Sequence, residues 1–451
     1  MLDKKHIKYF KKILPVDFVL SEEGDCWAYG YDNSKMHVMP ECVLFADSKD
    51  QIKDIVRYCF ENTIPITTRG RGTGNTGGSV PIENSVVLSL EKMNKIIDID
   101  ISNRLAVVQP GVINKTLQDE LQKENFFWGP DPSSQDYSTI GGNIANNSAG
   151  PRAIKYGTPR DNILGLEFIS GTGEIHKTGV KTSKGVVGLD LTRLFVGSEG
   201  VLGILSEATL KILPLNNSVK TFEITFETLK SASDMIIMLM TQPITPYTLE
   251  FVDEQSVKLI NSIKKNHFEI NTKSAVLLEI DGDVDFIDIQ SKKLLKLMQS
   301  KEHKKITIAE NKTEIAELWK ARKSLSPALK EIGGYKINED IAVPISNLTR
   351  LLNNLSAISK KYGIRIVNFG HAGNGNIHVN LIFDTIKEKN SKNSKNCLEE
   401  IFDSVLDLNG TISGEHGIGI IKKSFLEKEV DKITLDLMNN IKKQFDPKKI
   451  L

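Results

Sequence analysis

Short apolar runs alternate with amphipathic stretches from about residue 40 to Pro214, a pattern typical of a mixed α and β domain. The apolar runs predict strands at 43–46, 64–68, 86–90 and 105–108, and the amphipathic stretches predict helices at 49–62 and 114–124. Ser48 stands where a helix N-cap is expected. Residues 1–35 predict a helical lead-in. We therefore expect a domain over 36–214 behind this lead-in.

The pattern changes after Pro214. Of the 33 glycines in the chain, 22 precede residue 215, which indicates tight turns and close backbone approach in the first part only. The later pattern predicts strands at 219–226, 248–252 and 275–280 and helices at 231–241, 313–325, 345–362 and 431–444. Pro327 is expected to end or kink its helix, and the Lys, Asn and Ser-rich run 386–396 predicts a solvated loop or frayed helix. We expect an α+β substrate or cap domain over 215–400 and a C-terminal segment over 401–451.

Charge and cysteine content narrow the function classes. The 451 residues carry 58 basic and 57 acidic side chains, so no long-range field favours nucleic acid or an anionic membrane. No apolar run approaches the roughly 18 residues of a membrane span. Cys26, Cys42, Cys59 and Cys397 form no Cys-x-x-Cys pair, which argues against an iron–sulfur cluster and for a reducing compartment. With its charged N-terminus, the chain is expected to be cytoplasmic, with peripheral membrane contact through a partner left open.

Residues 69–78 hold five glycines with two Thr, one Asn and two Arg. Such a loop lets successive backbone N–H groups converge on an anion such as a pyrophosphate. Its spacing is neither a Walker A loop nor a Rossmann fingerprint, and a glycine-rich turn without a ligand is the alternative. Together with two more glycine-rich segments, 139–150 and 196–204, the loop predicts a site for one large planar ligand that is lined by backbone.

A second cluster lies in the runs 370–380 and 413–417. The 376–382 run predicts a strand with Asn376, His378 and Asn380 on one face, and His371 on the preceding turn can fold back toward them. With Glu415 these imidazoles form a His-His-Glu set suited to Zn²⁺, with Mn²⁺ or Fe²⁺ as alternatives. The alternative is that both histidines are core residues whose ring nitrogens hydrogen-bond to the backbone and bind no metal. His416 is the candidate general base, since a neutral imidazole can take a hydroxyl proton.

In combination, these motifs resemble the FAD-binding module of vanillyl-alcohol oxidase and p-cresol methylhydroxylase. The Gly-His-x-Gly-x-Gly-Asn-x-His and Gly-Glu-His-Gly motifs are similar to the branch of D-lactate dehydrogenase, the glycolate oxidase flavin subunit and D-2-hydroxyglutarate dehydrogenase. The resemblance covers roughly residues 36–451. It implies an α+β fold in which two subdomains bind FAD, with an α+β cap domain and a C-terminal helical segment that returns to the FAD site.

The resemblance also implies cofactor contacts. It assigns the pyrophosphate to Arg69, Gly70, Arg71, Gly72, Thr73, Gly74, Asn75, Gly77 and Gly78. It assigns the flavin and its ribityl chain to Pro132, Ser138, Gly141, Gly142 and Asn147, and the adenine side to Gly200, Gly203 and Ile204. Asn380 is included among the cofactor-binding residues. Because the 69–78 loop holds neither His nor Cys, the FAD is expected to be non-covalent.

Relatives of this kind place an arginine against the substrate carboxylate, and Arg322 in the Leu-Trp-Lys-Ala-Arg run matches that position. A guanidinium binds a carboxylate through two hydrogen bonds and fixes which face of the substrate meets the flavin. Ser326 can add a hydrogen bond, and Lys336 is a weaker candidate. The alternative is that Arg322 is a surface charge of a helix.

The expected activity is FAD-dependent oxidation of a D-2-hydroxy acid, with D-lactate or glycolate favoured. D-2-hydroxyglutarate dehydrogenase-like activity and a catalytically passive flavin subunit are alternatives. A non-redox flavoprotein similar to alkyl-glycerone-phosphate synthase is disfavoured, since it has no need of the two histidines. Without an iron–sulfur motif, electrons must leave to a separate acceptor or electron-transfer subunit, and a homodimer is compatible with the chain.

Overall fold

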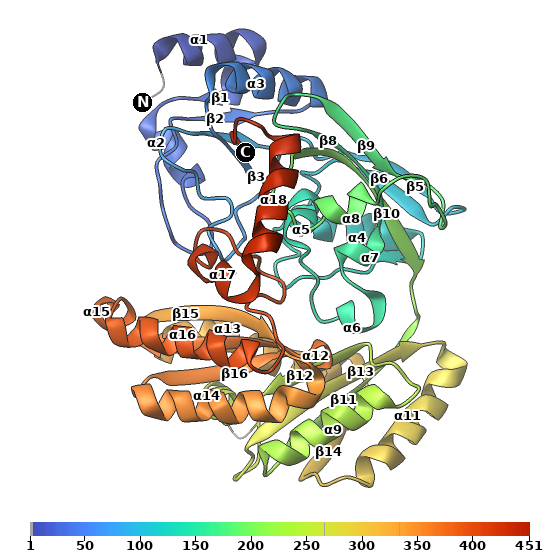
Figure 1. The fold of residues 1–451 in the computed structure, drawn as a ribbon. Coiled ribbons are helices and arrows are strands. Elements are labelled where there is room, and N and C mark those ends of the chain that lie inside the picture. The colour runs from blue at the N-terminus through green and yellow to red at the C-terminus, as the bar shows by residue number, and fades with distance from the viewer. Residues whose placement is uncertain (1–2, 266, 333) are drawn as a thin grey trace. The chain divides into compact units, whose positions relative to one another are not determined.

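The computed structural model describes residues 3–265, 267–332 and 334–451, and the chain divides into two compact units. The first unit comprises Met1–Gly150, Gly157–Leu215 and Glu415–Leu451. The second comprises Pro151–Tyr156 and Asn216–Gly414. Each unit therefore contains segments that are distant in sequence, as the colours of Figure 1 show.

The first unit begins with a four-stranded sheet of order β1-β2-β4-β3, counted over the described residues. Its strands are β1 (Val19–Leu20), β2 (Cys42–Phe45), β3 (Ile66–Arg69) and β4 (Val86–Ser89). Strand β1 is antiparallel to β2, while β2, β4 and β3 are parallel. Helices α1 (Lys4–Ile13), α2 (Glu23–Cys26) and α3 (Lys49–Asn62) accompany them, with 3-10 turns at Val16–Phe18 and Trp27–Tyr29.

An antiparallel sheet of order β5-β6-β10-β8-β9, with β7 also paired to β10, completes the strands described in the first unit. The strands are β5 (Ile96–Asp100), β6 (Leu105–Val108), β7 (Phe126–Trp128), β8 (Ile163–Ile169), β9 (Ile175–Gly179) and β10 (Ile204–Pro214). The helices are α4 (Asn114–Lys123), α5 (Ile140–Asn146), α7 (Pro159–Asn162), α8 (Leu191–Phe195), α17 (Leu426–Glu429) and α18 (Lys432–Phe445), with a 3-10 turn at Lys423–Phe425.

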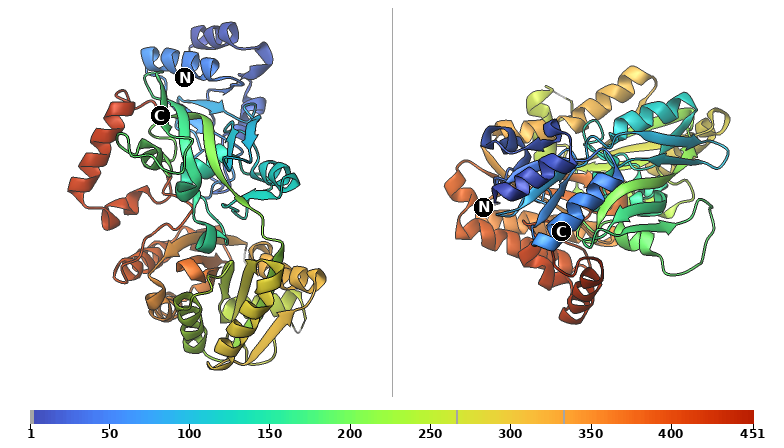
Figure 2. Two further views of the ribbon diagram at one scale, coloured as in Figure 1. Left: turned by 90° about the vertical axis from the view of Figure 1, so that its right-hand side faces the viewer. Right: turned by 90° about the horizontal axis from the view of Figure 1, so that it is seen from above.

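The C-terminal segment belongs to the core of the first unit. Ile66 N–H donates to the Ile450 carbonyl (2.6 Å), and Gly171 N–H donates to the Phe445 carbonyl (2.9 Å). Ile450 is 2% exposed and packs in the same apolar cluster as the β2–β4 sheet. Both ribbon views place the red C-terminal segment beside the blue and green elements of this unit (Figures 1 and 2).

The second unit is built on an antiparallel sheet of seven described strands, ordered β14-β11-β13-β12-β16-β17-β15. They are β11 (Ser218–Phe226), β12 (Thr248–Val252), β13 (Ser274–Gly282), β14 (Lys305–Ala309), β15 (Tyr335–Ala342), β16 (Arg365–His371) and β17 (Asn376–Phe383). Its helices are α6 (Ala153–Tyr156), α9 (Leu229–Thr241), α10 (Glu254–Ile263), α11 (Val284–Gln299), α12 (Lys312–Lys323), α13 (Leu325–Ile332), α14 (Leu348–Tyr362), α15 (Ile386–Lys389) and α16 (Lys392–Leu406), with 3-10 turns at Ile345–Asn347 and Ala372–Asn374.

The two faces of this sheet differ in character. One face is apolar, with buried Phe222, Leu278 and Phe251 on successive strands, and helices α9, α11 and α14 contact its strands. The other face alternates apolar with polar side chains and is covered by α10, α12 and α13. Because residues paired across strands project from the same face, the register of this second face decides which functional groups meet.

Several expectations about elements need correction. The 386–396 run, expected to be a solvated loop or a frayed helix, forms capped helices: Thr385 and Glu388 form a capping box, and Ser391 accepts from Ser394 N–H (3.1 Å), so α15 and α16 begin there. Composition misled because Ser and Thr favour helix starts as well as loops. The lead-in is not only helical, since β1 joins the first sheet. The predicted helix 313–325 breaks at Ser324, and Pro327 lies within the first turn of α13, where its missing N–H is tolerated.

None of the helices in the described part of the chain is long and apolar enough to span a bilayer. Cys26, Cys42, Cys59 and Cys397 are buried free thiols. Burial raises the pKa of Cys397 to about 11 and that of Cys42 well above its usual range. These thiols are therefore protonated packing groups at neutral pH.

Candidate functional site

The glycine loop of the first unit lies against helix α5. The 69–78 loop follows β3, and a Cβ added at Gly70 would come within 2.4 Å of the Thr139 hydroxyl oxygen, the N-cap of α5. Gly72 and Gly77 have positive φ angles of 63° and 81°, which a side chain would strain. The backbone of this loop thus approaches the start of α5 in a way that only glycine permits.

The third glycine segment meets the other end of α5. Gly197 N–H donates to the Ile144 carbonyl (2.9 Å) and Glu199 N–H donates to the Ala145 carbonyl (2.8 Å). Asn147 ends the helix with a φ of 55° in the left-handed region. The structure therefore brings the three glycine-rich segments together around one short helix.

The loop that carries His416 is fastened to the same region. The carboxylate of Glu199 accepts hydrogen bonds from Ile418 N–H (2.8 Å) and Gly419 N–H (2.7 Å). The Thr76 hydroxyl donates to the His416 carbonyl (3.2 Å), and the Asn75 amide nitrogen lies 3.2 Å from Nε2 of His416. Two of these contacts join the glycine loop to the candidate base, and the other two join Glu199 to the residues that follow it.

Other residues expected at the cofactor have partners within the protein. Arg69 donates to the Tyr31 carbonyl (2.7 Å), and Nε of Arg71 lies 3.3 Å from a carboxylate oxygen of Glu91. Ser138 accepts from Asn143 (3.2 Å). A Cβ on Gly141 or Gly203 would collide with Pro110 or Phe168, so these glycines are needed for packing, and Ile204 is a fully buried core residue. Pro132, whose carbonyl accepts from Gln135 N–H, and Gly200, with a φ of 82°, are turn residues.

A cavity of about 610 Å³ opens beside Gly72 and Thr73. Trp27, Tyr31 and Tyr137 contribute aromatic walls to it. Its volume lies within the range of small-molecule and cofactor sites. A phosphate-bearing ligand held by the glycine loop therefore has room beside it.

The polar face of the second sheet carries both histidines. His371 on β16 pairs in register with Glu250 on β12, and His378 on β17 pairs with Phe369 on β16 and Asp340 on β15. Since Phe369 and His371 are two residues apart on one strand, all these side chains share a face. The expectation that Asn376, His378 and Asn380 lie on one face is confirmed, because they alternate along β17.

Glu250 links His371 to Arg322. Its Oε1 accepts from Nδ1 of His371 (2.5 Å), and its Oε2 accepts from Nε (2.9 Å) and Nη2 (2.7 Å) of Arg322. Burial alone raises the pKa of Glu250, but the charges of His371 and Arg322 outweigh it and hold this pKa below its usual range. Arg322 is therefore not a solvated surface charge, since its side chain is 13% exposed and paired.

A second buried carboxylate fixes the same helix. Trp319, three residues before Arg322 on α12, donates from Nε1 to Glu279 (2.7 Å), and the Thr221 hydroxyl donates to the same oxygen (2.7 Å). Burial raises the pKa of Glu279. The Trp-x-x-Arg spacing thus anchors α12 to the sheet at two points.

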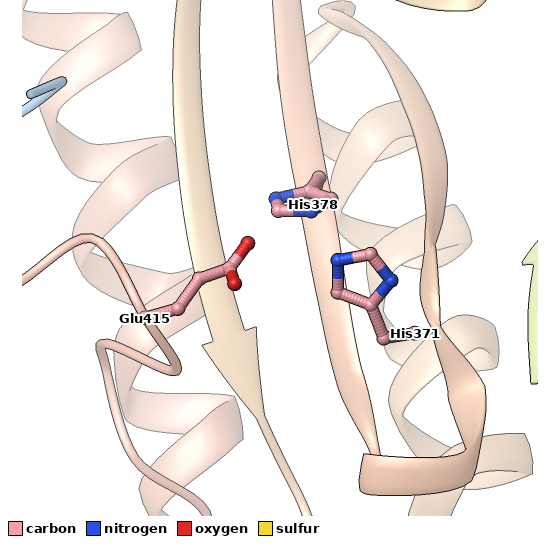
Figure 3. Close-up of side chains that lie close together, drawn as sticks. All are labelled: His371, His378 and Glu415. Carbon is pink, nitrogen blue, oxygen red and sulfur yellow. The ribbon is translucent and has the colours of Figure 1, made fainter. Parts of the chain in front are cut away.

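His371, His378 and Glu415 form a group of metal-ligand character. One ligand atom from each residue lies within 4.8 Å of the others (Figure 3). Oε2 of Glu415 accepts from Gly150 N–H (3.2 Å). The preceding residue, Gly414, donates its N–H to the Asp340 carbonyl on β15 (3.2 Å). Two imidazoles and one carboxylate at this separation fit a divalent ion.

Three further candidates, Ser326, Lys336 and Asn380, lie in the second unit outside the His371, His378 and Glu415 group. Ser326 is exposed on α13. Lys336 on β15 is half-buried and projects from the same face as Asp340, four residues on. Asn380 is fully buried, donates to the Val367 carbonyl (3.1 Å) and accepts from Asn338 (2.6 Å).

Two residues were missed by the sequence analysis. Glu250 stands in an otherwise apolar run, Thr-Leu-Glu-Phe-Val, and a lone carboxylate in a buried strand was the available signal. Glu199 lies inside the glycine-rich segment 196–204, whose glycines indicate a role of the backbone and not of a carboxylate. Its partners are more than 200 residues away in sequence, so no local pattern could reveal them.

Comparison with known protein families gives two matches. Residues 215–451 match the family described as FAD linked oxidases, C-terminal domain. Residues 40–179 match the FAD binding domain. The two matches together cover most of the chain.

Characterised relatives extend along nearly the whole chain. The glycolate oxidase subunit GlcD of Bacillus subtilis is 37% identical over 94% of this chain and 90% of its own length. A D-lactate dehydrogenase of Anaerostipes hadrus is 31% identical over 99% of this chain and 95% of its own length. Among solved structures, p-cresol methylhydroxylase matches 99% of this chain and 95% of its own with a TM-score of 0.80 at 18% identity. That likeness confirms the expected α+β FAD-binding fold.

Proposed function

Since this chain belongs to the family of FAD-linked oxidases, we propose that it is a dehydrogenase that oxidises a D-2-hydroxy acid to the 2-oxo acid, with D-lactate or glycolate as substrate. The observation that carries this proposal is the His371, His378 and Glu415 group. The named activities of the glycolate oxidase and D-lactate dehydrogenase relatives support the same substrate class. When bound, FAD accepts the hydride of the C–H bond, and a divalent metal lowers the pKa of the adjacent hydroxyl.

The residues of the chain supply binding and proton transfer. His371, His378 and Glu415 hold the metal, and Zn²⁺ suits this donor set, with Mn²⁺ or Fe²⁺ as alternatives. His416 takes the hydroxyl proton, while Asn75 and Thr76 restrain its imidazole and backbone. Arg322 receives the substrate carboxylate, and Ser326 or Lys336 adds a hydrogen bond.

The cofactor contacts proposed for the first unit remain those of the glycine segments, from Arg69–Gly78 to Ile204, with FAD held non-covalently. We further propose that electrons leave to a separate acceptor or subunit. The B. subtilis relative is named as a subunit of glycolate oxidase, which favours this arrangement and keeps a passive flavin subunit as the second candidate.

The purified yellow protein is expected to lose its oxidised-flavin absorbance when D-lactate or glycolate is added without oxygen. D-2-hydroxyglutarate belongs in the same panel, because it tests the related dehydrogenase activity. L-lactate is the stereochemical control. If no 2-hydroxy acid reduces the flavin while dithionite does, the proposed substrate class is rejected.

Gly74→Val is expected to yield folded protein without FAD. A Cβ at this position would meet only ordinary contacts, 3.7 Å from Asp32 and 3.9 Å from Asn146, so the protein itself has room for a side chain. A valine side chain on the ligand side of the loop is expected to occupy the space that a phosphate needs to reach the backbone N–H groups. FAD released by acid precipitation is measured by fluorescence, which also tests non-covalent binding. Gly24→Val, where an added Cβ meets nothing within 4 Å, is the matched control. Full FAD content in Gly74→Val would remove the loop from the cofactor site.

A further inference from the structure

The carboxylate of Glu250 lies in the middle of the second sheet. Strand β12 pairs with β13 on one side and β16 on the other, and Glu250 stands between Leu277 and His371 in the cross-strand row. The residue is 2% exposed. An ionised carboxylate in such a place is very costly unless its oxygens are fully paired. The partners of Glu250 therefore indicate why a charge is kept there.

Each oxygen of Glu250 serves a different functional residue. Oε1 accepts from Nδ1 of His371, and Oε2 accepts from Arg322. Because an ionised carboxylate can only accept hydrogen bonds, Nδ1 of His371 must carry the ring proton. Nε2 is then the ring nitrogen that offers a lone pair to a metal, as in carboxylate–histidine–metal arrangements.

Arg322 is oriented by the same contact. Its Nε and Nη2 edge faces Glu250, and its guanidinium carbon lies 4.7 Å from the centre of the Phe369 ring. The guanidinium has further N–H groups on Nη1, which is the edge that can address a second carboxylate. Since α12 is also anchored through Trp319 and Glu279, the position of Arg322 is set by the sheet.

We propose that Glu250 is a positioning residue that fixes His371 and Arg322 relative to each other. Through it, the hydroxyl and the carboxylate of one 2-hydroxy acid are received at a set separation. This inference rests on the proposed function. The distance between the metal ligand His371 and the carboxylate-binding Arg322 is then set by the sheet and not by a flexible loop.

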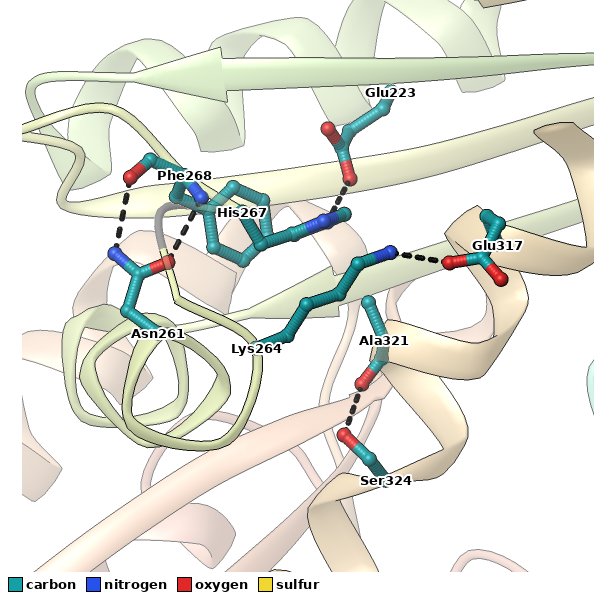
Figure 4. Close-up of polar contacts among 8 residues, drawn as sticks. All are labelled: Glu223, Asn261, Lys264, His267, Phe268, Glu317, Ala321 and Ser324. Atoms are coloured by element: carbon teal, nitrogen blue, oxygen red, sulfur yellow. Dashed lines mark hydrogen bonds and ion pairs between the residues drawn. The ribbon is translucent and has the colours of Figure 1, made fainter.

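The test compares buried Glu250 with half-buried Glu223, a second carboxylate of the same sheet. Glu223 lies in the same cross-strand row beyond Leu277, and its carboxylate is bound by His267 (3.0 Å) rather than by His371 or Arg322, as Figure 4 shows for His267. Glu250→Gln keeps the shape and removes the charge, and Glu223→Gln is the matched control. Zn²⁺ affinity is measured by competition with a chromophoric chelator. We expect about 10- to 100-fold weaker binding in Glu250→Gln and wild-type binding in Glu223→Gln.

Kinetics separate positioning from general damage. Glu250→Gln is expected to raise KM and lower kcat together for 2-hydroxy acids, with FAD content unchanged. Glu250→Asp withdraws the carboxylate by one methylene and serves as the second variant, also expected to bind Zn²⁺ more weakly than wild type. Wild-type Zn²⁺ affinity in either folded variant, or no Zn²⁺ binding by the wild type, would overturn the inference. Weakened Zn²⁺ binding in a protein that oxidises no 2-hydroxy acid would reject the proposed function and retain the positioning of His371.

Discussion

Removal of the divalent metal by a chelator is expected to abolish oxidation of 2-hydroxy acids while the oxidised-flavin spectrum persists. The reason is that a metal stabilises the developing alkoxide by several kcal/mol, or roughly 100- to 1,000-fold in rate. Zn²⁺ or Mn²⁺ should restore activity. His378→Ala should reproduce the loss without rescue by added metal.

Two controls sharpen this result. His303→Ala removes an imidazole of the second unit that hydrogen-bonds to the Lys301 carbonyl (2.7 Å), and it should keep wild-type activity. Metal content is measured by elemental analysis on the same samples. Full activity in a sample shown to be metal-free would reject the assignment of His371, His378 and Glu415.

Arg322→Ala is expected to lower kcat/KM for 2-hydroxy acids by ~30-fold to several thousand-fold. Loss of a charge-assisted pair to the substrate carboxylate costs on the order of 2–5 kcal/mol in transition-state binding. Arg322→Lys should recover little, since a point charge cannot reproduce the planar fork. The measurement is kcat/KM for a 2-hydroxy acid and for a simple alcohol without a carboxylate.

The Glu250 contact makes a control essential, because Arg322→Ala also leaves a buried carboxylate without one partner. If Arg322 acts only through Glu250, Zn²⁺ affinity falls and the preference for carboxylate-bearing substrates is kept. If Arg322 binds substrate, that preference collapses. Lys320→Ala removes an exposed cation of the same helix and should change neither quantity. Unaltered oxidation of every 2-hydroxy acid by Arg322→Ala would move the clamp elsewhere, with Lys336 next to be tested.

Local signals predicted the elements well where they were strong. Ser48 accepts from Gln51 N–H (3.4 Å) and α3 runs over Lys49–Asn62, as its cap and periodicity indicated. The one-sided polar pattern of β17 follows from the two-residue period of a strand. What local signals could not predict is pairing across the sheet. Glu250 and His371 are 121 residues apart, so only the strand order makes them neighbours.

The same limit applies to Arg322. Its motif indicated a functional position, but sequence alone could not distinguish a substrate clamp from a helix charge. The observed pairing shows a third arrangement, in which the guanidinium is held by an internal carboxylate. In chains of this kind, an acidic residue within an apolar strand is thus a candidate partner for the arginine of the Trp-x-x-Arg motif.

The entry of the C-terminal segment into the core of the first unit has a consequence for folding during synthesis. Domains generally fold in the order in which they leave the ribosome. Here the second unit has all its strands once Phe383 has emerged, whereas Ile66 must await the carbonyl of Ile450. The unit that contains Ile66 is therefore the last to complete its packing, and the nascent chain must keep the exposed edge of β3 from other partners until Ile450 has emerged.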